Sequence, residues 1–226
     1  MIKSCPVCGS LDISESNVLW SDLIIEWQLT QIEVDYINRQ QGLNCKICNN
    51  NLRAMALSSA ILKSFGIVEN LDRFCNISNK IKVLEINLAY QLTPFLKKLP
   101  NHVLIEYPKY DMMELDIEDS QFDLVIHSDC LEHLSDPIKA LSECYRVLDV
   151  DGICIFTVPL VIGRMSRPRE GMKKIYHGAP NQYSPDQLVH TEFGADIWSY
   201  VIQAGFRSCE IFALEYPSGL SLIARK

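Results

Sequence analysis

Apolar residues repeat along this chain with two periods, and the change between them divides the chain into two regions. The first region has helical spacing and predicts three helical segments, over 21–27, 30–42 and 52–65. Thr30 and Glu33 form a capping box for the second segment, and Asn50 or Asn51 caps the third. The third segment is expected to connect the first region to the second, which begins near residue 80.

The second region alternates short apolar runs with helical patterns. Strands are predicted over 81–86, 103–106, 122–127, 152–158, 207–214 and 219–224. Helices are predicted over 93–99, 137–148 and most of 185–204. Apolar strands separated by helices predict a mostly parallel sheet covered on both faces, and a Tyr-Pro-Ser-Gly turn before the last strand predicts an antiparallel hairpin at one edge.

One pair of cysteines lies near the beginning of the first 51 residues, and another pair lies near their end. Cys5 and Cys8 form one CxxC motif, and Cys45 and Cys48 form another. Two such turns can complete a tetrahedral four-thiolate zinc site, whereas a redox CxxC needs only one pair beside a βαβ unit. We therefore predict a structural zinc knuckle with a helical insert over 1–51, followed by a second domain over 52–226.

The composition of the chain argues against several classes of protein. A formal charge of −7 over 226 residues disfavours broad contact with a nucleic-acid backbone. Nine cysteines, an odd number, and no recognisable signal peptide argue against a disulfide framework, so we expect a cytoplasmic protein without a membrane span. The oligomeric state does not follow from the sequence.

The segments 122–137, 140–148 and 151–159 carry a family resemblance. They read FDLVIHSDCLEHLSDP, ALSECYRVL and DGICIFTVP. In order and spacing they resemble the central part of class I S-adenosylmethionine (SAM) dependent methyltransferases of the type-11-like group. The resemblance implies an α/β, Rossmann-like methyltransferase fold, with a mostly parallel seven-stranded sheet and an antiparallel edge hairpin, and SAM as cofactor.

Matching positions to the family implies a set of SAM-binding residues at successive strand ends. Carboxylates at Glu106 and Asp111 would accept from the ribose hydroxyls and the adenine amino group, with Met112 beside the ring. The same matching adds residues after the first strand and after the strand over 122–127: Glu85, Asn87, Ala89, Ser128 and Asp129. The family has a glycine-rich loop where this chain has Asn87 and Ala89, and this departure puts the usual cofactor contact in question.

Histidines supply the candidate bases for deprotonating an acceptor. We expect His127, inside a strand pattern, to be a core residue. The candidate bases are His133, in the Leu-Glu-His motif after the strand over 122–127, and His177 and His190. The loop from Gly163 to Gly178 is rich in arginine and lysine, which predicts either a solvated loop or a mobile lid that binds an anionic acceptor.

Three functions remain open on the sequence. The first is SAM-dependent O-methylation of a small-molecule or saccharide acceptor such as an anionic or nucleotide-linked sugar. The second is RNA methylation with the knuckle gripping RNA, which the negative charge and the few lysines near the cysteines (Lys3 and Lys46) disfavour. The third is a non-catalytic binding protein whose SAM pocket has degenerated.

Overall fold

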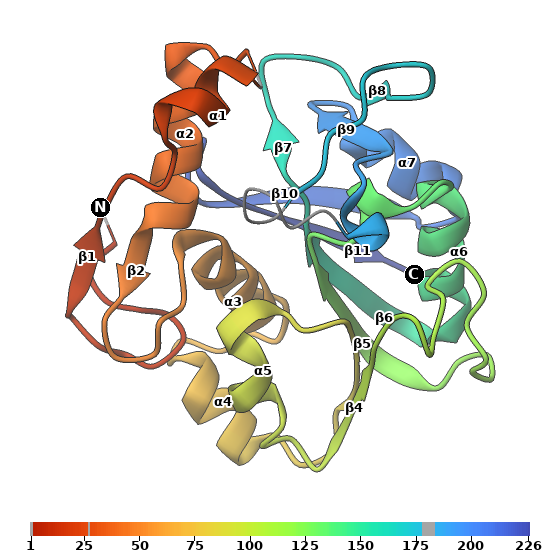
Figure 1. The fold of residues 1–226 in the computed structure, drawn as a ribbon. Coiled ribbons are helices and arrows are strands. Elements are labelled where there is room, and N and C mark those ends of the chain that lie inside the picture. Colours follow the sequence, from red (N-terminus) through yellow and green to blue (C-terminus); the bar gives the residue numbers. More distant parts are fainter. Residues whose placement is uncertain (1, 27, 178–183) are drawn as a thin grey trace. The chain divides into compact units, whose positions relative to one another are not determined.

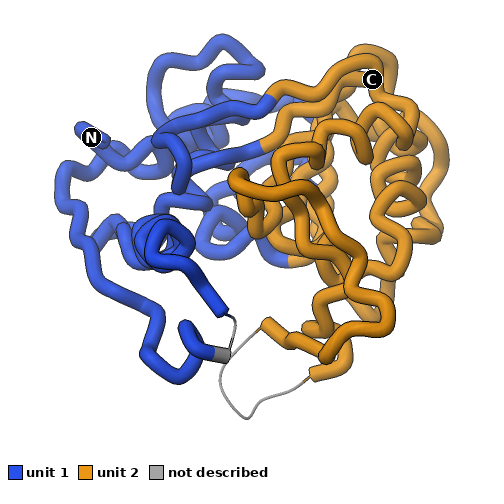
Figure 2. Tube along the Cα trace, turned by 90° about the horizontal axis from the view of Figure 1, so that it is seen from above, with its two compact units in different colours: residues 1–81, 88–102, 211–221 blue, residues 82–87, 103–210, 222–226 orange. Residues whose placement is uncertain are grey.

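A computed structural model describes residues 2–26, 28–177 and 184–226. Two sequence predictions fall on residues outside this set: Trp27, in the first helical turn, and Gly178, at the end of the basic loop. The described chain divides into two compact units (Figure 2). Unit 1 comprises 1–81, 88–102 and 211–221, and unit 2 comprises 82–87, 103–210 and 222–226. The domain boundary after residue 51 stays a prediction.

Unit 1 is mainly helical (Figure 1). Its elements are β1 (Ile13–Glu15), α1 (Ser21–Glu26), α2 (Gln31–Gly42), β2 (Leu43–Cys45), α3 (Leu52–Ser64), α4 (Leu71–Ile77), the 3-10 turn η1 (Tyr90–Leu92) and α5 (Thr93–Leu96). Thr30 and Glu33 form the predicted capping box of α2. The sequence analysis missed α4 and the antiparallel pairing of β1 with β2.

Helix α3 forms the core of unit 1. The Asn51 side chain accepts from the Ala54 N–H at its N-terminus, and Gly66, at φ 67°, follows its end. Leu52, Met55 and Ile61 are fully buried, as their helical spacing predicts. In the described part of the chain, no helix has the length and apolar character needed to cross a membrane.

A six-stranded sheet organises the second region (Figure 1). Its order is β10-β11-β6-β5-β3-β4, with bounds Ser208–Glu215, Gly219–Arg225, Leu148–Thr157, Phe122–Ser128, Lys82–Ile86 and Asn101–Ile105. β3 pairs parallel with β5, and β5 parallel with β6, whereas β11 is antiparallel to β6. Helix α6 (Pro137–Val147) connects β5 to β6, capped by the Asp136 side chain. The predicted class, mostly parallel with an antiparallel edge, is confirmed.

The sheet has six strands in the described residues, where seven were expected. The segment 106–121, between β4 and β5, contains only an isolated bridge of Asp111 with Glu114. Most of its side chains are exposed, although Met113, Leu115 and Ile117 alternate with acidic residues as in a half-buried strand. The chain nevertheless crosses this segment in turns.

The prediction that 185–204 is mostly helical is wrong in its first half. This stretch forms the 3-10 turn η3 (Pro185–Gln187), strand β9 (Thr191–Gly194) and only then helix α7 (Ile197–Gln203). β9 lies between β7 (Leu160–Val161) and β8 (Arg167–Pro168). Val189, Thr191 and Phe193 are buried, and the residues between them are partly exposed. This period-two alternation was the available signal of a strand.

Candidate functional site

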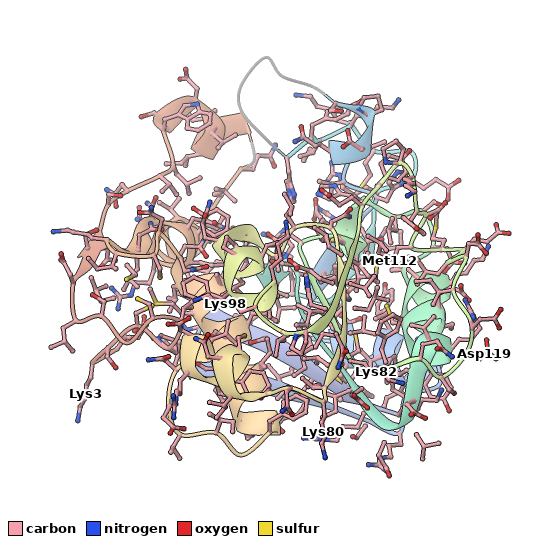
Figure 3. All side chains as sticks on the ribbon, turned by 90° about the horizontal axis from the view of Figure 1, so that it is seen from below. Lys3, Lys80, Lys82, Lys98, Met112 and Asp119 are labelled. Carbon is pink, nitrogen blue, oxygen red and sulfur yellow. The ribbon has the colours of Figure 1, made fainter. Side chains whose placement is uncertain are left out.

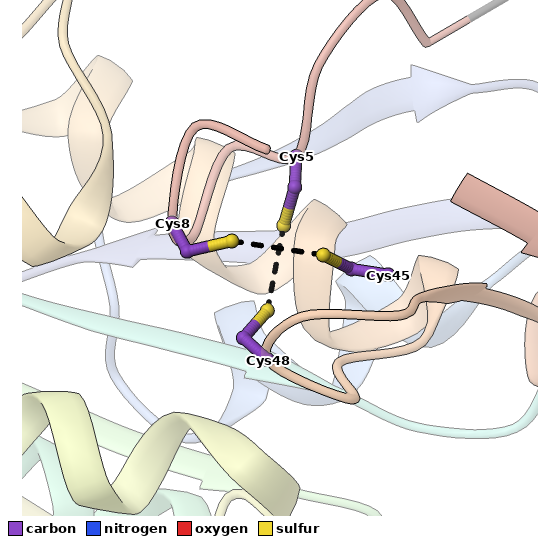
Figure 4. Close-up of side chains that lie close together, drawn as sticks. All are labelled: Cys5, Cys8, Cys45 and Cys48. Atoms are coloured by element: carbon purple, nitrogen blue, oxygen red, sulfur yellow. Dashed lines mark hydrogen bonds between the residues drawn. The ribbon is translucent and has the colours of Figure 1, made fainter. Parts of the chain in front are cut away.

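The four paired cysteines of unit 1 come together at one point (Figure 4). We call Cys5, Cys8, Cys45 and Cys48 the thiolate cluster. The Sγ atoms of Cys5 and Cys48 lie 3.6 Å apart, as do those of Cys8 and Cys45. In a tetrahedral site with metal–sulfur bonds of about 2.3 Å, neighbouring sulfurs are about 3.8 Å apart. The cluster therefore fits a zinc ion with four protein ligands.

Both CxxC turns have the same backbone form. Gly9 N–H donates to the Cys5 carbonyl at 2.8 Å, and Asn49 N–H donates to the Cys45 carbonyl at 2.8 Å. Gly9 and Asn49 both have left-handed backbones, with φ of 80° and 55°. Glycine and asparagine are the residues that adopt this conformation most readily, so the residue after each CxxC closes the knuckle.

The thiolate cluster is tied to the helices of unit 1. The backbone N–H groups of Leu71 and Asp72, at the start of α4, donate to the carbonyls of Pro6 and Val7 at 2.9 Å. Burial raises the pKa of the Cys8 thiol to about 11. Burial also acts to raise the pKa of Cys45, but N–H groups and neighbouring thiols outweigh it and lower that pKa to about 7. Lys3, beside the first pair, points to solvent (Figure 3).

In unit 2, the carboxyl ends of the parallel strands β3, β5 and β6 meet at one edge of the sheet, which we call the cofactor edge. Asn87 follows β3 directly and has a left-handed backbone, at φ 56°. Its backbone N–H donates to the Ile105 carbonyl at 2.8 Å, and its side-chain oxygen accepts from the Tyr107 N–H at 2.9 Å. Asn87 thus provides, without glycine, the backbone conformation that glycine would allow.

A second polar group lies at the ends of β5 and β6. The hydroxyls of Ser128 and Thr157 are 2.9 Å apart, and the Thr157 hydroxyl donates to the Asp129 carboxylate at 3.3 Å. Asp129 also has a left-handed backbone, at φ 50°, and its N–H donates to the Thr157 carbonyl. Sequence reasoning found Ser128 and Asp129 but missed Thr157, which the strand register places opposite Ser128.

The remaining predicted SAM-binding residues lie in or after the strands β3 and β4. Glu85 is fully buried within β3, and Glu106 follows β4 with its side chain exposed. Asp111 is exposed and accepts from the Met113 N–H at 2.8 Å, while Met112, labelled in Figure 3, is 4% exposed. Ala89 belongs to unit 1, where it is buried and precedes η1. Their roles toward SAM stay predictions.

Two of the three candidate bases come together in unit 2. The His133 Nε2 lies 3.5 Å from Oε1 of Glu132, and the His177 Nδ1 lies 3.7 Å from the same oxygen. The two imidazole rings are 5.0 Å apart at their centroids, edge to face. We call Glu132, His133 and His177 the Glu–His–His cluster. Sequence reasoning missed Glu132, although it stands inside the Leu-Glu-His motif that was singled out.

The third candidate, His190, supports its neighbours through its backbone. Its N–H donates to the Glu132 carbonyl at 2.7 Å, and its carbonyl accepts from the Arg169 N–H at 2.8 Å. Its side chain is half-buried and is not part of the Glu–His–His cluster. His127 is the expected core residue, because it is fully buried and stacks on Phe156, and burial lowers its pKa to about 3.

The arginines of the basic loop converge on Glu192. Arg167 pairs with it at 2.6 Å, Arg164 approaches it at 3.9 Å, and Arg169, itself buried, also pairs with it. Arg167 in addition lies in β8, paired with β9. Residues 164–169 are therefore held to β9 by ion pairs and strand pairing, while movement of the loop as a lid stays a prediction.

Part of this chain is similar in sequence to proteins described as methyltransferases. Residues 66–156 match the model of a methyltransferase domain family. A protein of Mycobacterium tuberculosis, described as a probable S-adenosylmethionine-dependent methyltransferase, is 30% identical over 112 residues, covering 46% of this chain and 36% of its own length. One of Mycolicibacterium smegmatis with a similar description is 35% identical over 63 residues, 26% of this chain and 24% of that protein. The chain thus spans roughly a quarter to a third of the length of these relatives.

Among solved structures, a Burkholderia thailandensis 1,6-didemethyltoxoflavin-N1-methyltransferase with bound S-adenosylhomocysteine is similar, with a TM-score of 0.47 at 14% identity. That similarity covers 95% of this chain and 94% of the other.

Proposed function

We propose that this protein transfers a methyl group from SAM to an oxygen of a small-molecule or saccharide acceptor, because residues 66–156 match the model of a methyltransferase domain family and a relative at 30% identity is described as a SAM-dependent methyltransferase. The observation that carries the proposal is the coincidence of the family match with the cofactor edge. The matched segment contains β3, Asn87, the Ser128–Asp129 pair and most of β6.

The cofactor edge would hold SAM through groups already in position. SAM supplies a methyl group activated on a sulfonium. The Glu106 carboxylate is exposed just after β4, where it can accept hydrogen bonds from both ribose hydroxyls. Asp111 can accept from the adenine amino group, with Met112 buried beside it. The left-handed Asn87 allows close approach of the backbone to the cofactor, in the place of a glycine.

We assign activation of the acceptor to the Glu–His–His cluster. Two of its members, Glu132 and His133, lie in the 3-10 turn η2 (Leu131–His133) that follows β5, and in open α/β sheets substrates bind beyond the carboxyl ends of the strands. As the acceptor oxygen loses its proton, its electron pair forms the new bond to the methyl carbon. The carbon–sulfur bond breaks, and its electron pair stays on sulfur, which gives S-adenosylhomocysteine. The cluster as a whole would promote this deprotonation, and His190 stays a candidate base on the sequence alone.

The charge around Glu192 supports an anionic acceptor. Three arginines meet this one carboxylate, so the group has three positive charges against one negative charge. Arg167 keeps 49% of its side chain exposed, which leaves guanidinium donors for a phosphate or carboxylate. This supports an anionic or nucleotide-linked sugar over a neutral one.

We assign the thiolate cluster to structural zinc. Four cysteines fill all positions of a tetrahedral ion, which leaves none for substrate. The hydrogen bonds from α4 to the carbonyls between Cys5 and Cys8 connect the zinc site to the helical core of unit 1. The zinc ion would therefore stabilise the fold of unit 1.

A release assay tests the proposal. The protein is incubated with SAM and a panel of acceptors, and S-adenosylhomocysteine is measured. We expect release with phosphorylated or nucleotide-linked sugars, less with their neutral counterparts, and a loss of at least tenfold in His177→Ala. Ser199→Ala, a change in α7 outside the proposed site, serves as the matched control. Release with RNA alone would contradict the acceptor class, and no release with any acceptor would contradict the proposed activity.

A further inference from the structure

Glu132 is a buried carboxylate whose charge is not compensated by hydrogen bonds. Its residue is 1% exposed, and neither carboxylate oxygen has a hydrogen-bond partner among the described residues. An ionised carboxylate in such a place loses its hydration and is costly unless a cation compensates it. A cation close to Glu132 is therefore expected.

The tautomer of His133 determines what this side chain presents to Glu132. Its Nδ1 lies 3.1 Å from the backbone carbonyl of Leu188, which can only accept, so Nδ1 carries a hydrogen. In the neutral imidazole, Nε2 then presents a lone pair, and this is the atom that faces Glu132 at 3.5 Å. Two lone-pair atoms facing each other inside the protein require a positive charge between them.

The third group approaches the same oxygen from a distant part of the chain. The His177 Nδ1 is 3.7 Å from Oε1 of Glu132, and the three ligand atoms all lie within 4.8 Å of one another. An ion held tetrahedrally at about 2.1 Å by nitrogen and oxygen would separate its ligands by about 3.4 Å. The distances to Glu132, 3.5 and 3.7 Å, exceed this value by about 0.1 and 0.3 Å.

We propose that Glu132, His133 and His177 bind a divalent transition-metal ion, in a site separate from the thiolate cluster. Two imidazoles and one carboxylate suit zinc, iron(II) or manganese(II) better than magnesium or calcium, which prefer oxygen ligands. The hydrogen bond from His133 to a backbone carbonyl is the second contact that metal-binding histidines commonly make. Three protein ligands leave at least one position open.

The role of this ion rests on the proposed function. An open position after β5 would let the ion act as a Lewis acid that lowers the pKa of the acceptor hydroxyl. The hydroxyl proton then passes to solvent, and the oxygen attacks the methyl carbon as described above. Metal binding itself does not depend on SAM or on an acceptor.

Counting zinc per chain tests the proposal. The full chain is incubated with excess Zn²⁺, passed through a gel-filtration column and analysed by elemental mass spectrometry. We expect two zinc ions per chain in the unaltered protein and one in Glu132→Ala and in His177→Ala. His190→Ala is the matched control, because its side chain lies outside the cluster, and it should keep two ions.

His177→Ala guards against misfolding, since this side chain is 30% exposed whereas Glu132 is buried. One zinc ion per chain in the unaltered protein would overturn the proposal. A second ion that persists in both variants would overturn it as well. Failure of the proposed function is a separate result, because it would show as absent S-adenosylhomocysteine release with the zinc count unchanged.

Discussion

The thiolate cluster and the Glu–His–His cluster both gather ligand atoms of metal-binding type, but the chain assembles them differently. In the thiolate cluster each pair comes from a local CxxC turn that repeats the same hydrogen bonds, so spacing alone predicts it. In the Glu–His–His cluster, Glu132 and His133 lie in the turn that follows β5, and the tertiary fold places His177 beside them. Local spacing reveals the first kind of site, and only tertiary structure reveals the second.

The largest expected effect comes from removing a thiolate. Cys45→Ser should lose the zinc ion of unit 1 and lower the free energy of unfolding by several kcal/mol, because four-thiolate sites contribute directly to folding. Chemical denaturation and zinc content measure this. Cys209→Ser, a partly exposed cysteine outside the cluster, is the control and should keep its zinc. An unchanged unfolding curve in Cys45→Ser would show that the two CxxC turns fold without metal.

An effect of opposite sign is expected at Glu132. In protein that holds zinc only at the thiolate cluster, Glu132→Gln should raise the free energy of unfolding by about 1–3 kcal/mol, because it removes an uncompensated buried charge. With excess Zn²⁺ the order should reverse, because only the unaltered protein gains the second ion. Thermal unfolding with and without added zinc measures both. Destabilisation by Glu132→Gln without added zinc would contradict the assignment of an uncompensated charge to this carboxylate.

A smaller effect is expected at Asn87. Asn87→Gly keeps the left-handed backbone and loses the side-chain hydrogen bonds with the Tyr107 N–H and the Cys130 sulfur, whereas Asn87→Ala also strains the backbone. We expect Asn87→Ala to be the less stable of the two by about 1 kcal/mol and to bind SAM more weakly. Denaturation and calorimetry compare them. Equal behaviour of the two variants would mean that the loop after β3 tolerates another conformation.

The smallest expected effect concerns the ion pairs of the helical insert. The Arg39 guanidinium, 2.6 Å from Glu215, lowers the pKa of that carboxyl below its ordinary 4.5. A lowered pKa contributes stability that is present above pH 4.5 and is lost as the pH falls through the folded-state value. Arg39→Ala should cost less than about 1 kcal/mol at pH 7 and reduce this dependence. Unfolding at pH 7 and at pH 4 tests it, and an equal loss at both pH values would contradict it.

Sequence patterns predicted most of the fold where local signals were strong. The capping box at Thr30 and the apolar periodicity of α3 gave helices close to those observed. The central strands were also predicted within a few residues. β9 was missed because Val189–Phe193 was taken as helical despite its alternation, and the absent seventh strand was expected from resemblance.

The candidate site could be predicted only in part, for a physical reason. The strand register places Thr157 beside Ser128, and no local pattern marks that pairing. The sequence showed the cations of the basic loop but not their partner, because Glu192, which pairs with them, lies on another strand. Ion pairs and hydrogen bonds between distant segments depend on the fold, so the sequence supplied the residue types but not their partners.

Calorimetric titration of SAM into the zinc-loaded protein tests most directly whether the cofactor edge binds SAM. We predict binding in the micromolar range that is lost in Asp111→Ala and in Glu106→Ala, two exposed positions whose substitution leaves the core intact. S-adenosylhomocysteine should bind at the same site. Absence of binding by either compound at millimolar concentration would contradict the account and would leave a methyltransferase fold that has lost its cofactor.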